Sequence, residues 1–279
     1  MIEVVRSGPL ATVQDLGRAG YAHLGVPPSG AADRASLCLA NRLIGNSEDA
    51  AGVELTFGSA ALRFESAAWI AVTGAPLPTS PVTMNAPCHV PAGTVVEFGA
   101  PSAGVRTYVA VRGGVDVPTV LGSRSTDVLS GLGPPPLSAG DRLAVGHTTG
   151  VITVDVAPGL EPEGEPVLRI AAGPRDDWFA TLAPLTEAAY EVTTQSNRVG
   201  VRLDGPALKR RRSEELPSEG MVTGSLQVPP NGLPIIFLAD HPTTGGYPVA
   251  AVLATDDIAR AAQLRPGQRV RFRFAAGGV

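Results

Sequence analysis

Short apolar segments bounded by glycine or proline follow one another along most of the chain, and this pattern most constrains the fold. The 279 residues include 33 glycines and 26 prolines. Segments rich in β-branched and aromatic residues between such turn residues are typical of short strands. We expect strands at Ile2–Val5, Val53–Phe57, Ala61–Phe64, Trp69–Thr73, Thr94–Phe98, Val105–Val111, Leu143–Val145, Val151–Val156, Val167–Ala171, Tyr190–Thr194, Val199–Leu203, Ser225–Val228, Pro234–Leu238, Val249–Ala254 and Arg269–Phe274. Thr12–Gly20 is interpreted as a polar loop, and the chain is expected to be mainly β.

Three similar turns recur along the chain. Val90–Val96, Leu137–Leu143 and Leu264–Val270 share the pattern apolar–x–x–Gly–x–x–apolar. Glycine adopts positive φ at little cost, and each turn is followed by an expected strand. We interpret the turns as recurring hairpins of a closed or nearly closed β-barrel, in one copy or in two lobes. Closure would remove the open edges that so many short strands otherwise leave.

Only three helices are expected. The first lies within His23–Asn46, where one helical face carries apolar residues at spacings of three and four: Leu37, Ala40, Leu43 and Ile44. Asp33 lies in its first turn and Gly45 provides a left-handed stop. Two shorter helices are expected at Asp176–Leu182 and at Asp257–Leu264, the latter capped by Asp256.

The segment Ala157–Pro166 is acidic, rich in proline and glycine, and without periodicity. Such composition is typical of a linker. We therefore expect one functional unit spanning residues 1–279, with two lobes at 1–160 and 161–279.

Composition excludes several classes of function. The net charge of −4 does not indicate the positively charged surface that nucleic-acid binding requires. No apolar run approaches the roughly 18 residues that a membrane span needs, and the first residues lack the pattern of a secretory signal. The two cysteines and four scattered histidines show no spacing typical of a disulfide framework or a metal site. We expect a cytoplasmic protein without a bound metal.

Two arginines are candidate ligands for an anion. Arg198 and Arg202 are four residues apart on an expected strand, so both would lie on one face. A guanidinium group binds carboxylate or phosphate through two N–H donors. The alternative is an ordinary solvated strand face, in which case Arg18 and Arg124 are the next candidates.

A second candidate site is the segment from Asp240 to Tyr247. It places an acid, an imidazole and two hydroxyl groups between two expected strands, at Asp240, His241, Thr243 and Thr244. Gly245 and Gly246 would allow backbone N–H groups to approach a ligand oxygen, and Tyr247 completes the set. An ordinary long hairpin is the alternative interpretation.

The order of several motifs resembles one known family. They are TVQDLGRAG, GVPPSGAADRASLCLANRLIGN, YVAVRGGVDVPTVLGSRSTD, SNRVGVRLDG, GSLQVPPNGLPIIFLADHPTTGGYP and LRPGQRVRF. In this order they resemble the biotin-dependent carboxyltransferase family, which includes bacterial 5-oxoprolinase C subunits and is also called allophanate hydrolase subunit 2 or KipA-like. The resemblance covers essentially the whole chain and implies a cyclophilin-like β-barrel architecture.

The resemblance also implies an activity and partners. The implied reaction is the ATP-driven opening of 5-oxo-L-proline to L-glutamate, together with the other two proteins of 5-oxoprolinase, a KipI-like B subunit and an A subunit. From residue type, Asp240 and His241 would move a proton. Arg198, Arg202 and the segment Thr243–Tyr247 would bind substrate or phosphate.

No phosphate-binding motif with a Walker-type lysine is present, and Lys209 is the only lysine. We therefore expect ATP to bind unconventionally or at the junction with the KipI-like partner. The chain has no Met-Lys-Met segment, so biotin is not expected to be attached to it. Two other functions remain open: a carboxyltransferase component of a urea carboxylase-like system, and a KipA-like regulator that binds a KipI-like kinase inhibitor.

Overall fold

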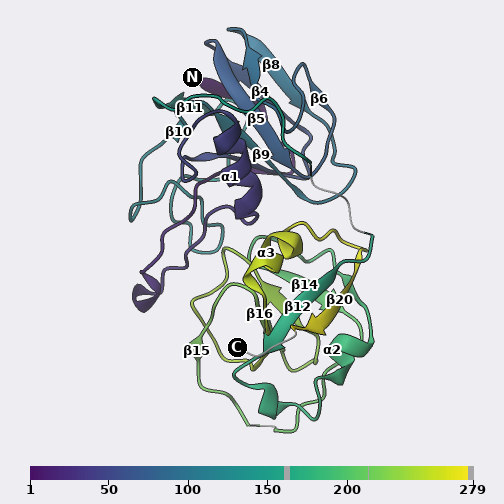
Figure 1. The fold of residues 1–279 in the computed structure, drawn as a ribbon. Helices are drawn as coiled ribbons and strands as arrows, with labels where there is room; N and C mark the ends of the chain where they lie inside the picture. Colours follow the sequence, from purple (N-terminus) through teal and green to yellow (C-terminus); the bar gives the residue numbers. More distant parts are fainter. Residues whose placement is uncertain (160–163, 213, 276–279) are drawn as a thin grey trace. The chain divides into compact units, whose positions relative to one another are not determined.

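The computed structural model describes residues 1–159, 164–212 and 214–275, and the chain divides into two compact units (Figure 1). The first unit comprises Met1–Arg18 and Ser29–Pro162, and the second comprises Ala19–Pro28 and Glu163–Val279. The linker expected at Ala157–Pro166 includes residues 160–163, which lie outside the described residues. The described residues form mainly strands with three α-helices, which confirms the expected fold class.

Two antiparallel sheets form the first unit. The six-stranded sheet has the order β10 (Val115–Asp116), β11 (Arg142–Val145), β1 (Ile2–Arg6), β4 (Ala60–Phe64), β8 (Thr94–Phe98) and β6 (Thr79–Ser80). The five-stranded sheet has the order β2 (Leu10–Gln14), β3 (Gly52–Thr56), β9 (Arg106–Val111), β5 (Ala68–Gly74) and β7 (Cys88–Val90).

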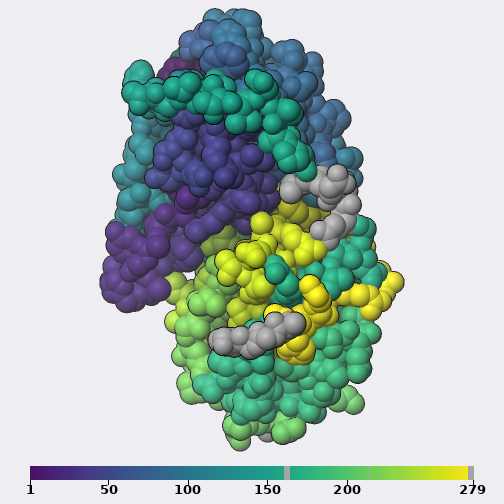
Figure 2. All heavy atoms as spheres, in the orientation of Figure 1, coloured from purple at the N-terminus to yellow at the C-terminus, as the bar shows by residue number. Residues whose placement is uncertain are grey.

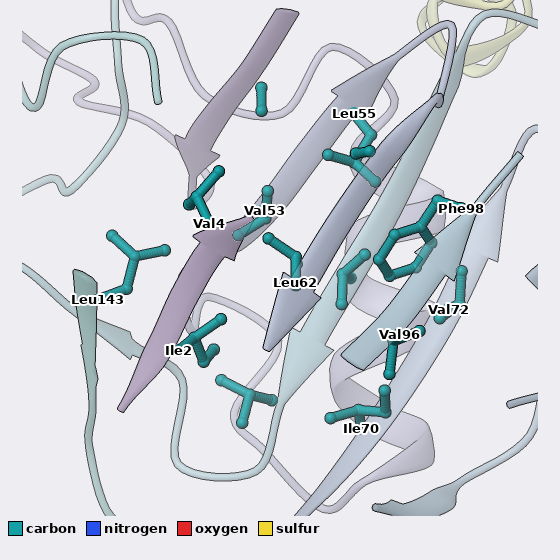
Figure 3. Packing of buried hydrophobic residues seen from close by; sticks show 14 of the residues in the cluster. Ile2, Val4, Val53, Leu55, Leu62, Ile70, Val72, Val96, Phe98 and Leu143 are labelled. Carbon is teal, nitrogen blue, oxygen red and sulfur yellow. The ribbon is translucent and has the colours of Figure 1, made fainter. Parts of the chain in front are cut away.

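Alternation of side chains builds the core of this unit. On β1, Ile2 and Val4 are buried, whereas Glu3 between them accepts a hydrogen bond from Arg63 on β4. Successive side chains of a strand point to opposite faces. The apolar faces of both sheets therefore contribute to one cluster, in which Leu62 and Phe98 meet Val53 and Val72 (Figure 3).

Helix α1 (Arg34–Leu43) packs against β5 and β9. Its N-cap is Asp33, whose side chain accepts a hydrogen bond from the backbone N–H of Ser36 at 3.0 Å. The Thr73 hydroxyl on β5 donates to the carbonyl of Ser36 at 2.7 Å. Gly45 follows the helix with φ 69°, as the expected left-handed stop requires. The first expected helix is confirmed.

A closed barrel of seven strands forms the second unit. Its order is β12 (Val167–Ala172), β19 (Val249–Leu253), β16 (Ser225–Gln227), β17 (Ile235–Phe237), β14 (Gly200–Asp204), β13 (Tyr190–Val192) and β20 (Arg269–Phe274). The barrel closes through the parallel pair β12–β20, whereas its other strand pairs are antiparallel. A separate two-stranded sheet joins β15 (Glu219–Gly220) to β18 (Thr244–Gly245).

The polar loop expected at Thr12–Gly20 is partly wrong, because its first residues belong to β2. Their polar side chains are buried rather than solvated. The amide nitrogen of Gln14 donates to the Thr12 hydroxyl and to the carbonyl of Thr126, each at 3.0 Å. Hydrogen bonds within the protein thus permit polar residues on a buried strand.

The strand expected at Val151–Val156 is also wrong, since no strand forms there. Val151 and Val156 are 73% and 67% exposed. A β-branched segment becomes a strand only where a neighbouring strand pairs with it and a surface covers it.

The two shorter helices differ from expectation. In place of Asp176–Leu182, a 3₁₀ turn at Asp176–Trp178 precedes the helix α2 (Ala183–Glu187). The backbone of Phe179 is extended and interrupts the helix. The last helix, α3, spans Thr255–Ala262 and has no side-chain cap at its N-cap residue Ala254, so the expected cap at Asp256 is wrong. None of the helices in the described residues is long and apolar enough to cross a membrane.

The glycines of the three similar turns all have positive φ: 81° at Gly93, 94° at Gly140 and 82° at Gly267. These turns lead into β8, β11 and β20. The first and third turns do not join hairpins, because β7 and β8 belong to different sheets and α3 precedes β20. The second lies in the long connection between β10 and β11, which do pair antiparallel. The glycine requirement is confirmed, whereas the hairpin interpretation is wrong for the first and third turns.

Candidate functional site

A buried ion pair joins Arg198 and Asp240 in the second unit. The side chains are 1% and 0% exposed. Arg198 donates from Nε to Oδ2 of Asp240 at 2.8 Å and from Nη2 to Oδ1 at 3.0 Å. Each oxygen of the carboxylate therefore receives a hydrogen bond from the same guanidinium group, in a bidentate arrangement.

Backbone pairing beyond the ends of two strands brings this pair together. The N–H of Leu238 donates to the carbonyl of Val199 at 3.0 Å, and the N–H of Asp240 donates to the carbonyl of Arg198 at 3.2 Å. These bonds continue the pairing of β14 with β17. The sheet itself therefore fixes the register of the ion pair.

The expectation that Arg198 and Arg202 share one strand face is wrong. Strand β14 begins only at Gly200, after a turn in which the Asn197 side chain accepts hydrogen bonds from the N–H groups of Val199 and Gly200. This turn breaks the alternation on which the spacing argument depended. Arg198 is buried and Arg202 is exposed, so an anion clamp made of both is not formed.

His241 follows the ion pair and is 2% exposed. Its ring stacks on Phe237 with a centroid distance of 5.8 Å and an interplanar angle of 18°. Its Nδ1 lies 2.8 Å from the carbonyl oxygen of Pro242. Because a carbonyl only accepts, Nδ1 carries the proton in this contact, and Nε2 of the neutral ring is the basic nitrogen.

The rest of the predicted loop lies closer to the surface. Thr243 is half-buried, and its carbonyl accepts from the N–H of Met221 at 2.9 Å. Thr244 is exposed and begins β18. Tyr247 is 44% exposed, and the guanidinium carbon of Arg210 lies 5.8 Å from the centre of its ring. This segment combines a buried acid and imidazole with the half-buried Thr243 and the exposed Thr244 and Tyr247.

The glycine at 245 has a packing reason within the protein. A Cβ added there would lie 2.5 Å from Nε2 of Gln227, which donates to the carbonyl of Tyr247 at 3.2 Å. A Cβ added at Gly246 would lie 3.4 Å from its nearest neighbour, the carbonyl oxygen of Leu216. The close approach of a ligand oxygen to these two glycines stays a prediction.

A second polar cluster, centred on Asp15, lies in the first unit and was missed by reasoning from residue type. Its carboxylate accepts four hydrogen bonds: from the hydroxyls of Ser123 at 2.6 Å and Ser125 at 2.5 Å, and from the N–H groups of Gly17 at 2.7 Å and Arg124 at 2.6 Å. Two of the motifs that carry the family resemblance, TVQDLGRAG and the end of YVAVRGGVDVPTVLGSRSTD, supply all of these residues. The occurrence of these two motifs in one chain was the sequence signal that could have indicated this cluster.

Burial raises the pKa of Asp15, but the hydrogen bonds from Ser123, Ser125 and the two backbone N–H groups outweigh it and lower the pKa below 3.8. A lowered pKa in the folded state stabilises the fold above the unfolded value, and this contribution is lost as the pH falls through the folded value.

We expect Asp15→Asn to lower the free energy of unfolding by about 1.5–3 kcal/mol at pH 7, as for hydrogen bonds to a charged group. The difference from wild type should shrink as the pH falls below 3.8. Urea denaturation at several pH values measures it. A difference that stays constant between pH 7 and pH 3 would contradict the assignment.

An open pocket of about 340 Å³ also lies in the first unit. Trp69, His89, Arg112 and His147 contribute to its lining, and the rings of Trp69 and His89 meet edge-on at 5.4 Å. Arg112 already donates to the carbonyls of Ile44 and Gly150. In the described part of the chain, no group of three or more His, Cys, Asp or Glu side chains is placed to hold a metal ion.

The segments that carry the family resemblance lie in both units, and a known protein family matches nearly the whole chain. The profile of the family described as "Carboxyltransferase domain, subdomain A and B" matches residues 24–274. The chain belongs to this carboxyltransferase family.

Relatives of this carboxyltransferase-family chain fall into two groups. It is 37% identical to the C subunit of 5-oxoprolinase from Escherichia coli K12, over 98% of this chain and 90% of the relative. The identity to the C subunit of 5-oxoprolinase from Haemophilus influenzae is 33%, with the same coverage. Urea amidolyase of Lachancea kluyveri is 32% identical over 97% of this chain, which corresponds to only 17% of that much longer protein.

Solved structures share the fold. The crystal structure of TTHA0988 matches with a TM-score of 0.89 at 33% identity, over 98% of this chain and 55% of that chain. The Kluyveromyces lactis urea amidolyase matches with a TM-score of 0.90 at 29% identity, over 99% of this chain and 19% of that chain. This chain therefore spans about half or less of these two solved chains.

Proposed function

We propose that this chain is one component of an ATP-dependent 5-oxoprolinase that opens 5-oxo-L-proline to L-glutamate in the cytoplasm. The observation that carries the proposal is the similarity to a 5-oxoprolinase C subunit over nearly the full length of both proteins. The naming of that relative as one subunit supports the need for further subunits, which we propose to be the A subunit and the KipI-like B subunit of 5-oxoprolinase.

The reaction explains the need for ATP. An amide carbonyl is a poor electrophile, and phosphorylation of its oxygen makes attack by water feasible. One water then adds to the ring carbon, the ring C–N bond breaks and its nitrogen becomes the amine of glutamate. A second water releases phosphate, so that 5-oxoproline, ATP and two waters give glutamate, ADP and phosphate.

ATP is proposed to bind on a partner protein or at the junction with it. This chain offers no Walker-type lysine, and its only lysine, Lys209, is exposed. The described residues also show no cluster of acidic side chains suited to a nucleotide-bound metal ion. Biotin is likewise not proposed to be attached here.

The Asp240–Tyr247 segment is proposed to carry out proton transfer and to hold substrate. His241 would move a proton through Nε2, since Nδ1 is held by the carbonyl of Pro242. Asp240 would fix the position of His241 through its pairing with Arg198. The hydroxyls of Thr243 and Thr244 and the N–H groups of Gly245 and Gly246 would bind developing negative charge.

Arg202 and Tyr247 are both exposed in the second unit. We propose that they contact the substrate or the phosphate. In this proposal Arg198 binds no ligand directly, because its Nε and Nη2 already bind Asp240.

A second candidate function has its own support. The family description and the 32% identity to a urea amidolyase favour a carboxyltransferase component of a urea carboxylase-like system. In that case a biotin carried by another protein would deliver the carboxyl group.

Reconstitution tests the proposal. The isolated chain is expected to form no glutamate from 5-oxo-L-proline, whereas the chain with the A and B subunits and ATP should do so. Release of phosphate and of glutamate are both measured, with and without ATP. The same assembly supplied with a carboxylated biotin carrier and urea tests the second function.

Full turnover by the chain alone, or turnover of the assembly without ATP, would contradict the proposed role within a larger enzyme. Carboxylation of urea in place of lactam opening would favour the second function. Omission of one protein at a time provides the control for a contaminating activity.

A further inference from the structure

Arg18 is a buried cation of the first unit, with 2% of its surface exposed. Its Nε donates to the carbonyl of Val120 at 3.3 Å, and its Nη2 donates to the carbonyl of Ser125. In the part of the chain that the structure describes, Nη1 makes no hydrogen bond and no carboxylate lies within 4.0 Å of the guanidinium group. The groups that Arg18 binds directly are therefore neutral carbonyls, and the carboxylate of Asp15 is connected to it only through Ser125, whose hydroxyl donates to that carboxylate.

Burial of a charge without a directly paired countercharge is unfavourable. Buried N–H groups also nearly always have a hydrogen-bond partner. An arginine with both features indicates a position at which a bound anion supplies the missing charge and acceptor. The residues that follow Arg18, Ala19 and Gly20, are exposed, and the segment that contains them is dark purple in Figure 2.

Two more buried groups without partners among the described residues lie beside Arg18. Thr126 follows Ser125, the residue whose carbonyl binds Arg18, and its hydroxyl makes no hydrogen bond there. Gln14 donates from Nε2 to the carbonyl of Thr126 at 3.0 Å, and its Oε1 makes no hydrogen bond within the same described residues. Because the carbonyl of Thr126 only accepts, the amide nitrogen of Gln14 must face it, and the atom left over is an acceptor.

Together these groups offer a cationic donor, a hydroxyl group and an acceptor, on side chains that are connected through the carbonyls of Ser125 and Thr126. We propose that Arg18, Thr126 and Gln14 form a binding subsite for a carboxylate that carries a neighbouring N–H group. The carboxylate binds Nη1 of Arg18 and the hydroxyl of Thr126, and the N–H group of the ligand donates to Oε1 of Gln14. Phosphate satisfies the first two groups equally well, and a P–OH group of inorganic phosphate can also donate to Gln14, so measured affinities rather than the hydrogen-bonding pattern distinguish the two ligand classes.

5-Oxo-L-proline has the proposed arrangement, because its lactam N–H lies next to the carbon that bears the carboxylate. The choice of this probe rests on the proposed function, whereas the subsite itself rests on the unpartnered groups. The test therefore measures binding by the full chain, separately from turnover by the assembled enzyme.

Isothermal titration of the full chain with three probes tests the subsite: 5-oxo-L-proline, cyclopentanecarboxylate, which lacks the N–H group, and inorganic phosphate. 5-Oxo-L-proline is expected to bind most tightly. Thr126→Val and Arg18→Gln should each weaken its binding by about 10- to 150-fold, as expected for loss of a hydrogen bond to a charged group.

Thr126→Val is the decisive variant, because the hydroxyl it removes has no partner among the described residues and its loss should not unfold the chain. It carries the test even where Arg18→Gln fails to fold. Thr193→Val is the matched control, since it removes another buried hydroxyl that lacks a described partner, in the second unit. It should leave the affinity unchanged.

Equal affinity of wild type and Thr126→Val for 5-oxo-L-proline would overturn the subsite. Binding of phosphate alone would overturn the assignment to a carboxylate with an N–H group. If the assembled enzyme opens 5-oxoproline but the full chain binds none of the three probes, the subsite is wrong and the proposed function stands. Binding that is sensitive to Thr126→Val without turnover by the assembly supports the subsite and contradicts the proposed function.

Discussion

The reconstituted complex carrying His241→Asn is expected to turn over 5-oxo-L-proline about 10²- to 10⁴-fold more slowly than the wild-type complex, the range for loss of a general acid–base group. Asparagine can place an N–H group near the position of Nδ1 and so keep the contact with the carbonyl of Pro242. It has no nitrogen that titrates near neutral pH. The variant thus separates proton transfer from loop structure.

The pH profile of kcat/KM provides a readout that a purely structural role would not change. The change of kcat/KM with pH that results from protonation of the imidazole should be present in wild type and absent in His241→Asn. His89→Asn is the matched control, because His89 is an exposed histidine of the first unit. Turnover of His241→Asn within threefold of wild type, with an unchanged pH profile, would remove His241 from the mechanism.

Replacement of Asp240 by asparagine is expected to lower the free energy of unfolding of the second unit by about 3–5 kcal/mol, as for removal of one partner from a buried ion pair. The variant keeps the shape of the side chain but removes the charge that binds Nε and Nη2 of Arg198. Urea denaturation followed by tryptophan fluorescence measures the loss. Trp178 is 5% exposed and lies in the second unit, so a Trp69→Phe background makes the signal specific to that unit.

The double variant Arg198→Met with Asp240→Leu should recover part of this loss, because apolar residues of similar volume often replace a buried ion pair at little cost. The coupling between the two sites then follows from the double-mutant cycle. A loss below about 1 kcal/mol in Asp240→Asn, where a broken buried pair costs about 3–5 kcal/mol, would mean that water reaches the pair and screens it.

Local patterns predicted most of the elements, because their causes are local. Alternation of apolar side chains identifies β1 and β4, since the two faces of a strand meet different surroundings. The apolar face, Asp33 and Gly45 identified α1, because caps and helical spacing depend on neighbouring residues. Positive φ at the glycines of the three similar turns followed in the same way from single residues.

The Arg198–Asp240 pair could not be predicted from local patterns. The two residues are 42 positions apart, and their contact depends on the pairing of β14 with β17. The spacing of Arg198 and Arg202 predicted a shared face only on the assumption of an uninterrupted strand, and the turn at Asn197 delays the start of that strand to Gly200. Side-chain spacing predicts a shared face only where the backbone keeps its period.

The sequence by itself determined that this chain is mainly β, where its main turns lie and which family it belongs to, since each depends on residue type and order. Only the tertiary structure decided that Thr12 and Gln14 lie on a buried strand, that Val151–Val156 forms none, and that Arg18 is buried without a directly paired carboxylate among the described residues. The physical reason is that strand pairing and burial depend on partners distant in the sequence. A segment and its polar groups take the state that those partners allow.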